Sequence, residues 1–419
     1  MTIWLSKLLL DWLVIQVSLI FAFVRCLRSH RQYQQKLLPD DQLPKTAVIL
    51  CLRGADPFLS TCLRALLNQN YPQYDLKLVI DRQEDPAWQI AIDIIQEQGA
   101  TNVEVNSLRF IRKDCSLKCS SLLQAILELD KSYQVVALVD ADTVVHANWL
   151  RELVSPLAHL HIGATTGYRW YLPTGSYWGS LVRYIWNVPT LVQMYLCGIP
   201  WGGTLAIKTD LLKPTGLLDA WGQALNEDMI IPNIFRQHRL QVKFVPSLIM
   251  VNREECDLPG VRSWLQRQLL CFRLGHPWWL VICIEAILTI LLPTLLIFWF
   301  LAALHSRQWQ TAVYSLGCYG GYTLTLLLMV LVLEREIQQI TRRHGEPITK
   351  LSASAICKLF IGIPLTQWVY GLAMLSSLWM STLKWRAITY RIHRTGKIRL
   401  VEYRPYRFSD QPSDRNLSL

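Results

Sequence analysis

The sequence predicts an α/β domain with a mostly parallel sheet and flanking helices, joined at both ends to α-helical membrane segments. Two observations lead to this fold class. Of the 419 residues, 52% are hydrophobic, which is too apolar for a soluble domain of this length. Between the most apolar stretches, short β-branched runs alternate with amphipathic helical patterns, as in parallel α/β sheets.

Four apolar spans are each close to the roughly 20 residues that a bilayer requires. They cover residues 5–24, 278–304, 311–333 and 355–381. No small-residue cleavage site follows the first span; Arg25, Arg28, Arg31 and Lys36 follow instead. We therefore expect an uncleaved anchor whose basic flank is cytosolic, in the plasma membrane or another inner membrane. The α/β domain that follows would then be cytosolic as well.

The number of crossings is left open by the sequence. If all three later spans cross, the basic tail lies outside, against the positive-inside tendency, so one span is expected to be re-entrant or interfacial. Residues 355–381 contain Lys358, Gly362 and Pro364, and residues 278–304 contain Glu285 and Pro293; either span qualifies. The expected organisation is an anchor (1–27), a cytosolic α/β domain (28–260), an interfacial amphipathic helix (261–277), a membrane region with two to three spans (278–381) and a basic tail (382–419).

The net charge of +11 does not indicate nucleic acid, because the basic residues concentrate beside apolar spans. In the tail they are Lys384, Arg386, Arg391, Arg394, Lys397 and Arg399, and anionic lipid is the expected partner. The eleven cysteines form no CxxC pair and no regular spacing with histidine, so neither a disulfide framework nor a zinc site is predicted.

The first half of the α/β domain reads strand, helix, strand, helix. Thr46–Leu52 is the first predicted strand, and apolar residues at helical spacing follow from Leu59 to Leu67. Leu76–Ile80 is the second strand and ends at Asp81; Ala87–Gln98 is the next helix, closed by Gly99.

Two further strands complete this part of the sheet. Val103–Phe110 is a weaker strand, Leu117–Leu129 is helical and carries Lys118, and Val135–Val139 is an apolar strand that ends in Asp140-Ala141-Asp142. Ligands of open α/β sheets bind at the carboxyl ends of the strands, so Asp81, Lys118 and Asp140 are expected to converge on one edge.

Five short motifs follow one another over roughly residues 45–275. They are Arg53-Gly54-x-Asp56-Pro57, Asn70-Tyr71-Pro72, Asp81 with Glu84-Asp85-Pro86, Asp140-x-Asp142, and Glu227-Asp228. In this order they resemble the motifs of family 2 glycosyltransferases of the GT-A type, and within them the ceramide glucosyltransferase-like branch.

The resemblance assigns roles to particular residues. It implies that Asp140 and Asp142 hold a divalent cation (Mg or Mn) and the nucleotide sugar, that Asp81 and Asp85 bind uridine, and that Lys118 lies near the phosphates. It implies that Asp228 is the base that activates the acceptor hydroxyl, with Glu227 beside it, and that Trp201, Gly202, Gly203 and Gln268 line the acceptor side. A cation held by carboxylates would offset the charge of the departing diphosphate.

Each of these assignments has a structural alternative. Asp-x-Asp after a strand is by itself usually a solvated turn, and Glu227-Asp228 could favour the dipole at a helix start. Asp85 could cap a loop, and Lys118 could be a solvated helix residue.

Two features bear on the acceptor. Aromatic residues crowd positions 168–186, as at a membrane interface or a lipid and sugar cleft. In residues 261–273 an apolar stripe predicts a helix lying on the bilayer. Here the resembling family often has Gln-x-x-Arg-Trp, but this chain keeps only Gln268 and has Cys271-Phe272 in place of Arg-Trp.

The function expected from the sequence is inverting transfer of one hexose, glucose or galactose, from a UDP-sugar to a lipid hydroxyl at the cytosolic membrane face. The lipid is ceramide-like, diacylglycerol or similar. The alternatives are a processive polysaccharide synthase, which the missing Arg-Trp pair disfavours, and a catalytically silent membrane scaffold or partner subunit. A transporter based on Glu285 has the least support.

Overall fold

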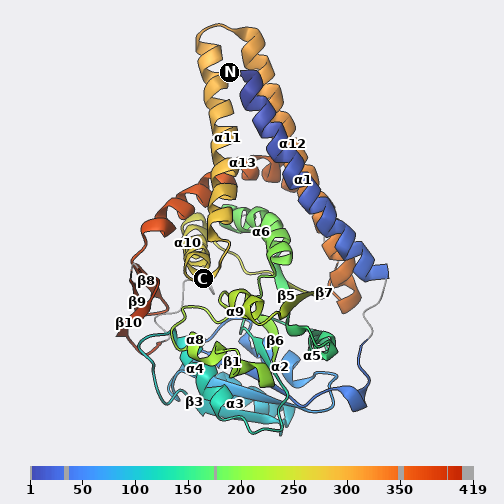
Figure 1. Ribbon diagram of the computed structural model, residues 1–419, viewed down its shortest axis with the longest axis vertical. Helices are drawn as coiled ribbons and strands as arrows, with labels where there is room; N and C mark the ends of the chain where they lie inside the picture. Colours follow the sequence, from blue (N-terminus) through green and yellow to red (C-terminus); the bar gives the residue numbers. More distant parts are fainter. Residues whose placement is uncertain (1, 33–36, 174–176, 348–352, 394, 408–419) are drawn as a thin grey trace.

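A seven-stranded mixed sheet forms the centre of the α/β domain, below a long helical bundle (Figure 1). The computed structural model describes residues 2–32, 37–173, 177–347, 353–393 and 395–407. The strand order is β3-β2-β1-β4-β6-β5-β7, and β6 alone runs antiparallel to its neighbours among these strands. The strands are β1 (Thr46–Leu52), β2 (Tyr74–Ile80), β3 (Val103–Ser107), β4 (Val135–Val139), β5 (Ile162–Tyr171), β6 (Thr204–Lys208) and β7 (Gln241–Asn252). The predicted fold class is confirmed.

Helices cover both faces of the sheet, so its central strands are buried on both sides. In β1, Val48 and Leu50 belong to one apolar cluster and Ala47 and Ile49 to the other, as the two-residue period of a strand requires. The helices of this domain are α2 (Leu59–Leu67), α3 (Pro86–Gln98), α4 (Leu117–Leu127), α5 (Trp149–Val154), α7 (Thr209–Leu212), α8 (Leu217–Trp221) and α9 (Ile231–Gln237).

Two predicted boundaries were too long. The strand expected to reach Phe110 ends at Ser107, and Phe110 is exposed. The helix expected to reach Leu129 ends at Leu127. In both cases apolar residues continue beyond the last residue of the element, so the hydrophobic pattern predicted an element that is too long.

Within the described residues, four helices are long and apolar enough to cross a membrane: α1 (Thr2–Gln32), α11 (Trp279–His305), α12 (Trp309–Thr341) and α13 (Ala353–Trp379). Figure 1 shows α1, α11 and α12 extending together away from the sheet, whereas α13 runs across the base of this bundle.

Contacts of the segments before and after α13 bear on the choice between the two candidate spans. Just before it, the His344 ring stacks on His146 of the α/β domain at 3.7 Å. Just after it, Arg386 donates a hydrogen bond to the carbonyl of Arg53 (2.6 Å). Because the chain contacts the same domain before and after α13, we infer that residues 355–381 are the better candidate for the re-entrant or interfacial segment, which stays a prediction. The tail then lies on the same side as the α/β domain, which removes the conflict with the positive-inside tendency.

The basic tail folds back onto the α/β domain. Strands β8 (Thr382–Trp385), β9 (Ile388–Ile392) and β10 (Ile398–Tyr403) form an antiparallel sheet. Leu383 and Tyr390 are buried in the cluster that contains Leu117 of α4, and the Tyr390 hydroxyl accepts a hydrogen bond from the Leu117 amide (3.0 Å). Residues 382–407 are therefore a folded part of this domain, and Lys384, Arg391, Lys397 and Arg399 are exposed on it, so the expected contact with anionic lipid stays a prediction. Residues 408–419 and Arg394 lie outside the described residues. In this tail apolar residues alternate with basic ones, and such alternation predicts β-strands. The prediction considered the net charge of the tail and not this alternation.

Helix α10 (Leu258–Gly275) contains the stripe that was expected to face the bilayer. Val261, Trp264, Leu265 and Leu269 are instead buried in the protein, where α10 packs on α6 (Trp178–Cys197) and α13. The apolar face thus contacts protein rather than lipid. A position of this helix at the membrane interface stays a prediction.

A buried ion pair joins α6 to the segment after β7, and its loss should destabilise the fold. Arg183 Nη1 lies 2.8 Å from Glu254 Oε2, with the side chains only 1% and 3% exposed. Arg183→Met leaves a buried carboxylate without this cation, so we expect a loss of about 3–5 kcal/mol in unfolding free energy. Thermal unfolding in detergent would measure it. Arg64→Met, which removes a pair with both side chains over 40% exposed, is the control and should cost at most about 1 kcal/mol; equal losses would contradict the prediction.

Candidate active site

A cavity of about 230 Å³ opens at the carboxyl ends of β1 and β4. The strand order reverses between these two neighbours, which is where open α/β sheets bind ligands. Its walls come from the α/β domain, from α6 and α10, and from the folded tail. The site is thus enclosed jointly by the sheet, the membrane-side helices and residues beyond 380.

Lys118 connects the two acidic motifs. Its Nζ lies 2.6 Å from Asp140 Oδ1 and 2.6 Å from Glu227 Oε1. Burial alone would raise the pKa of Asp140, but the charge and hydrogen bond of Lys118 hold it below its ordinary value. The structure therefore brings Lys118, Asp140 and Glu227 together, and Lys118 is not a solvated helix lysine.

Asp142 is poorly neutralised. Its Oδ2 is 3.5 Å from Arg169 Nη1 and 3.4 Å from Asn252 Nδ2. Burial raises its pKa to about 6, partly opposed by Arg169 and reinforced by Asp140. Two carboxylates at the end of one strand, with one of them short of positive charge, fit the oxygen ligands that hard divalent cations prefer. Asp140 and Asp142 are the residues that would hold such an ion.

The Asp228 carboxylate is held by the backbone and lacks a second partner. The Gly202 amide donates to Oδ2 at 3.0 Å, whereas Oδ1 is buried and has no hydrogen-bond partner among the described residues. Burial, together with the charge of Glu227, raises the pKa of Asp228 to about 7. The side chain does not cap α9, which starts at Ile231 without a side-chain cap. Asp228 therefore has the position and pKa of a general base.

Glycine is required at positions 202 and 203 by close packing. A Cβ on Gly202 would lie 1.9 Å from Glu227 Oε1, and one on Gly203 would lie 2.2 Å from the Trp201 ring and 2.8 Å from Asp140 Oδ2. The segment Trp201-Gly202-Gly203 thus runs between the two acidic motifs. Trp201 itself is a cavity residue, but the acceptor role predicted for this segment stays a prediction.

Gly202→Ala should disturb the site without unfolding the protein. The methyl group must push Glu227 away from Lys118, and displacements of about 1 Å in an active site can cost about a hundredfold in rate. The turnover number and the thermal stability of the variant are both measured, and we expect the first to fall while the second changes little. Gly320→Ala, where nothing lies within 4 Å of the new Cβ, is the matched control. An unchanged rate in Gly202→Ala would show that the position of Glu227 is not critical.

Asp81 and Asp85 lie outside the cavity lining, although Asp81 contacts the lining residue Arg53. Asp81 forms an ion pair with Arg53 and accepts a hydrogen bond from the Tyr403 hydroxyl (3.0 Å). Asp85 accepts from the amides of Gly54 (2.9 Å) and Ala87 (2.9 Å), and thereby caps α3. The capping alternative for Asp85 is confirmed. Asp81 and Asp140 follow β2 and β4, which both pair in parallel with β1, so they lie at the same edge of the sheet as expected, and Lys118 contacts Asp140 there. Neither Asp81 nor Asp85 lines the cavity itself, and uridine binding by either residue stays a prediction.

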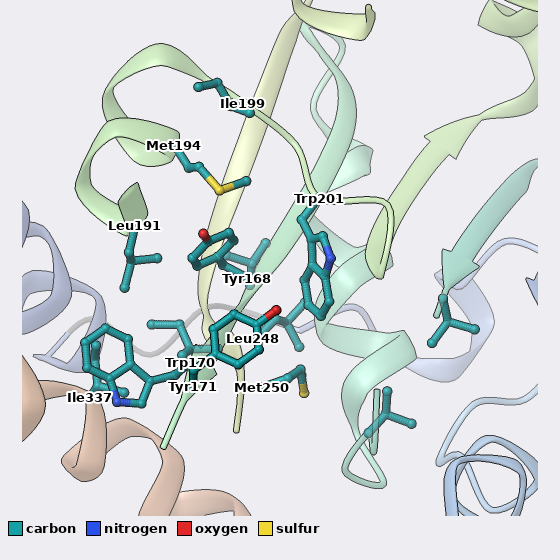
Figure 2. Packing of buried hydrophobic residues seen from close by; sticks show 14 of the residues in the cluster. Tyr168, Trp170, Tyr171, Leu191, Met194, Ile199, Trp201, Leu248, Met250 and Ile337 are labelled. Carbon is teal, nitrogen blue, oxygen red and sulfur yellow. The ribbon is translucent and has the colours of Figure 1, made fainter. Parts of the chain in front are cut away.

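The crowded aromatic residues divide between core and cavity wall. Figure 2 shows Tyr168, Tyr171 and Trp201 close together beside Leu191 and Met194 of α6. Tyr168, Tyr171 and Trp201 line the cavity, and the Arg169 guanidinium lies 5.2 Å from the ring centres of Tyr171 and Trp201. Trp170 is buried outside the cavity.

Sequence reasoning missed the arginines of the cavity. Gln268 lines the wall as predicted, with Cys271 and Phe272 beside it. Arg267 also lines it, and its guanidinium lies 5.0 Å from the centre of the Trp385 ring in the tail. An arginine and a tryptophan therefore do meet here, from α10 and β8 rather than from one motif. The signal was available in part, since Arg267 and Cys271 are four residues apart and share a helix face.

Comparison with known proteins agrees with this architecture. The family model described as Glycosyl transferase family 21 matches residues 10–398. Among solved structures, the mannosyltransferase PcManGT from Pyrobaculum calidifontis, determined with GDP-Man and Mn²⁺, has 14% identity and a TM-score of 0.50 over 90% of this chain and 99% of its own. Glucosyl-3-phosphoglycerate synthase from Mycobacterium tuberculosis, determined with Mn²⁺, UDP and phosphoglyceric acid, has 15% identity and a TM-score of 0.38 over 57% of this chain and 84% of its own.

Proposed function

Because the chain belongs to glycosyl transferase family 21, we propose that it transfers a single hexose from a UDP-sugar to a lipid hydroxyl, with inversion, at the cytosolic face of a membrane. The observation that carries this proposal is the Asp228 carboxylate. Its Oδ1 is buried without a hydrogen-bond partner in the described part of the chain, and it lies in a cavity that also contains Asp140 and Asp142. One wall of that cavity is α6, which packs on the membrane-region helices α13 and α1.

The chemistry follows from the positions of the side chains. The acceptor hydroxyl gives its proton to Asp228 Oδ1 as its oxygen bonds to the anomeric carbon, and the bond from that carbon to the diphosphate oxygen breaks on the opposite face. The Gly202 amide fixes the base through Oδ2. Glu227 keeps Lys118 beside Asp140, where the ammonium group offsets phosphate charge.

A divalent cation, Mg²⁺ or Mn²⁺, is proposed at Asp140 and Asp142. When bound, it would neutralise the charge that develops on the departing nucleotide diphosphate. The PcManGT structure contains Mn²⁺ and a nucleotide sugar in the same fold, which supports this assignment.

Product analysis tests the proposal. Purified full-length protein in detergent is supplied with labelled UDP-glucose, UDP-galactose or GDP-mannose, together with a membrane lipid extract and Mn²⁺. We expect a labelled lipid whose mass exceeds that of its acceptor by one hexose, formed from a UDP-sugar. A polymeric product would favour the synthase alternative. No labelled lipid with any donor, together with no Mn²⁺-dependent binding of UDP, would favour the silent scaffold.

A further inference from the structure

Two histidines and a glutamate gather where the end of α12 meets the α/β domain. His146 follows β4, Glu152 belongs to α5, and His344 belongs to the 3₁₀ turn that follows α12 (Arg342–His344). Figure 1 shows this end of α12 above α5, and the rings of His146 and His344 stack on each other there. One potential metal-ligating atom from each of the three residues lies within 4.8 Å of the other two. The cluster is separate from the active-site cavity, which none of the three residues lines.

His146 holds a ring nitrogen in place without a partner. Its carbonyl oxygen accepts hydrogen bonds from Gln69 Nε2 and from the Trp149 amide, each at 3.0 Å, which fixes the backbone. The side chain is only 13% exposed, and Nε2 is buried with no hydrogen-bond partner among the described residues. Burial lowers the pKa of His146 to about 3, so at neutral pH the ring is uncharged and keeps a lone pair on one nitrogen. A neutral imidazole with an unpaired nitrogen is a common metal ligand.

Glu152 supplies a carboxylate at the same place. Its Oε2 lies 4.0 Å from His146 Nε2, which is too far for a hydrogen bond, and its side chain is 11% exposed. Burial raises the pKa of Glu152, since a buried negative charge is unfavourable unless positive charge lies nearby. The neutral His146 ring provides no such charge. A divalent cation would compensate the carboxylate and bind the unpaired ring nitrogen at once.

The donor set favours a transition metal over the Mg²⁺ or Mn²⁺ proposed at Asp140 and Asp142. Imidazole nitrogens suit Zn²⁺, Ni²⁺ and Cu²⁺, whereas sites built from carboxylate and carbonyl oxygens suit Mg²⁺ and Mn²⁺. Around a tetrahedral Zn²⁺ ion, two histidines and one carboxylate leave the fourth position for water, and neighbouring ligand atoms lie about 3.4 Å apart. The three atoms of this cluster must therefore approach one another by no more than about 1.5 Å.

One of the two rings has to turn for an ion to bind. The rings of His146 and His344 are within 17° of parallel and their centres are 3.7 Å apart, so their in-plane lone pairs cannot both point at one ion. His344 is the ring that can turn, because it is half-buried and is followed by Gly345, whereas His146 is enclosed. The terminal torsion of a histidine side chain has a broad energy minimum, so this rotation costs little.

We propose that His146, Glu152 and His344 bind a divalent transition-metal ion of the zinc class. This site goes beyond the proposed function and does not depend on it. The ion ties the end of α12 to the segment between β4 and α5, which also carries Asp142. It therefore fixes the membrane region relative to the carboxyl end of β4. The three ligands are far apart in the sequence, which is why the spacing of cysteine and histidine residues did not indicate a zinc site.

Zinc binding by the full-length protein in detergent tests the inference. After chelation and removal of the chelator, the protein is titrated with Zn²⁺ against a chromogenic zinc indicator, with excess Mg²⁺ present to compete at Asp140 and Asp142. We expect one Zn²⁺ site whose affinity falls about a hundredfold or more in His344→Ala, since losing even a residue that only orients a metal ligand costs about 10–100-fold. Zn²⁺ should also raise the unfolding temperature of the unaltered protein and not that of His344→Ala.

His161→Ala is the matched control, because His161 is an exposed histidine of the same domain, directly before β5. It should keep the affinity of the unaltered protein. The inference is overturned if the unaltered protein binds no Zn²⁺, if His344→Ala binds it equally well, or if excess Mg²⁺ alone abolishes the binding. Glu152→Gln keeps the shape of its side chain and should show the same loss; if it cannot be purified folded, the half-buried His344 decides. Sugar transfer enters none of these measurements, so a failure of the proposed function leaves their result unchanged.

Discussion

Asp228→Asn should lower the turnover number by about 10²–10⁴-fold while the protein still folds and binds nucleotide. An amide of the same shape keeps the hydrogen bond from the Gly202 amide through its oxygen, but it cannot accept the proton of the acceptor hydroxyl. The variant also removes a buried carboxylate beside Glu227, so stability should not fall with activity. Initial rates with labelled donor, and UDP binding by calorimetry, measure both effects.

The control for this variant is Asp219→Asn, which makes the same chemical change at an exposed position on α8. It should retain the rate of the unaltered protein. If Asp228→Asn kept more than about a tenth of the rate, Asp228 would be a positioning residue at most and another group would have to serve as the base.

The pH dependence should report the same carboxylate. Burial and the charge of Glu227 raise the pKa of Asp228 to about 7, so the base is increasingly deprotonated, and active, as pH rises through that value. Rates at saturating substrate should therefore increase to a plateau between about pH 5 and about pH 9. In Asp228→Asn this rise should disappear from the residual activity. A rate that falls as pH rises through 7 would contradict the assignment.

Strands β1 and β4 could be predicted closely because they are buried on both faces, whereas no strand was predicted at β5, β6 or β7. Thr46–Leu52 is apolar after its first residue and Val135–Val139 is apolar at every position, and their ends are set by turn residues and acidic residues. The residues that follow β4, Asp140 and Asp142, were placed correctly at the strand end for the same reason. Features that depend on a single strand or helix and on the residues directly beside it could therefore be predicted from the sequence.

Contacts between distant segments were not accessible. Glu227 meets Lys118 because the irregular segment between α8 and α9 passes the end of β4, and no periodicity encodes that path. The tail was interpreted by its charge, although the alternation of Leu383, Ile388, Tyr390 and Ile392 with polar residues already indicated strands. Its consequence for the site, Trp385 beside Arg267, follows only once β8 is placed against α10.

Asp142→Asn should weaken Mn²⁺-dependent binding of UDP by about a hundredfold or more. The substitution keeps one oxygen donor but removes the negative charge, and hard divalent cations depend on carboxylate charge for affinity. Asp142 is the informative position because Lys118 already neutralises Asp140 at 2.6 Å, whereas the cation that pairs with Asp142 among the described residues, Arg169, lies 3.5 Å away. Calorimetry of UDP binding with Mn²⁺, and again after chelation with EDTA, gives the comparison.

After chelation the unaltered protein and the Asp142→Asn variant should bind UDP equally weakly, since the carboxylate would contribute only through the ion. Asp130→Asn, at an exposed position before β4, should retain full Mn²⁺ dependence. If the Asp142→Asn variant still gained affinity for UDP on addition of Mn²⁺ to the same extent as the unaltered protein, the cation would have to lie elsewhere. The crowding of Asp142 with Asp140, Asp56 and Glu254, which raises its pKa, would then need another source of compensating charge, and Arg169 is the nearest cation that could supply it.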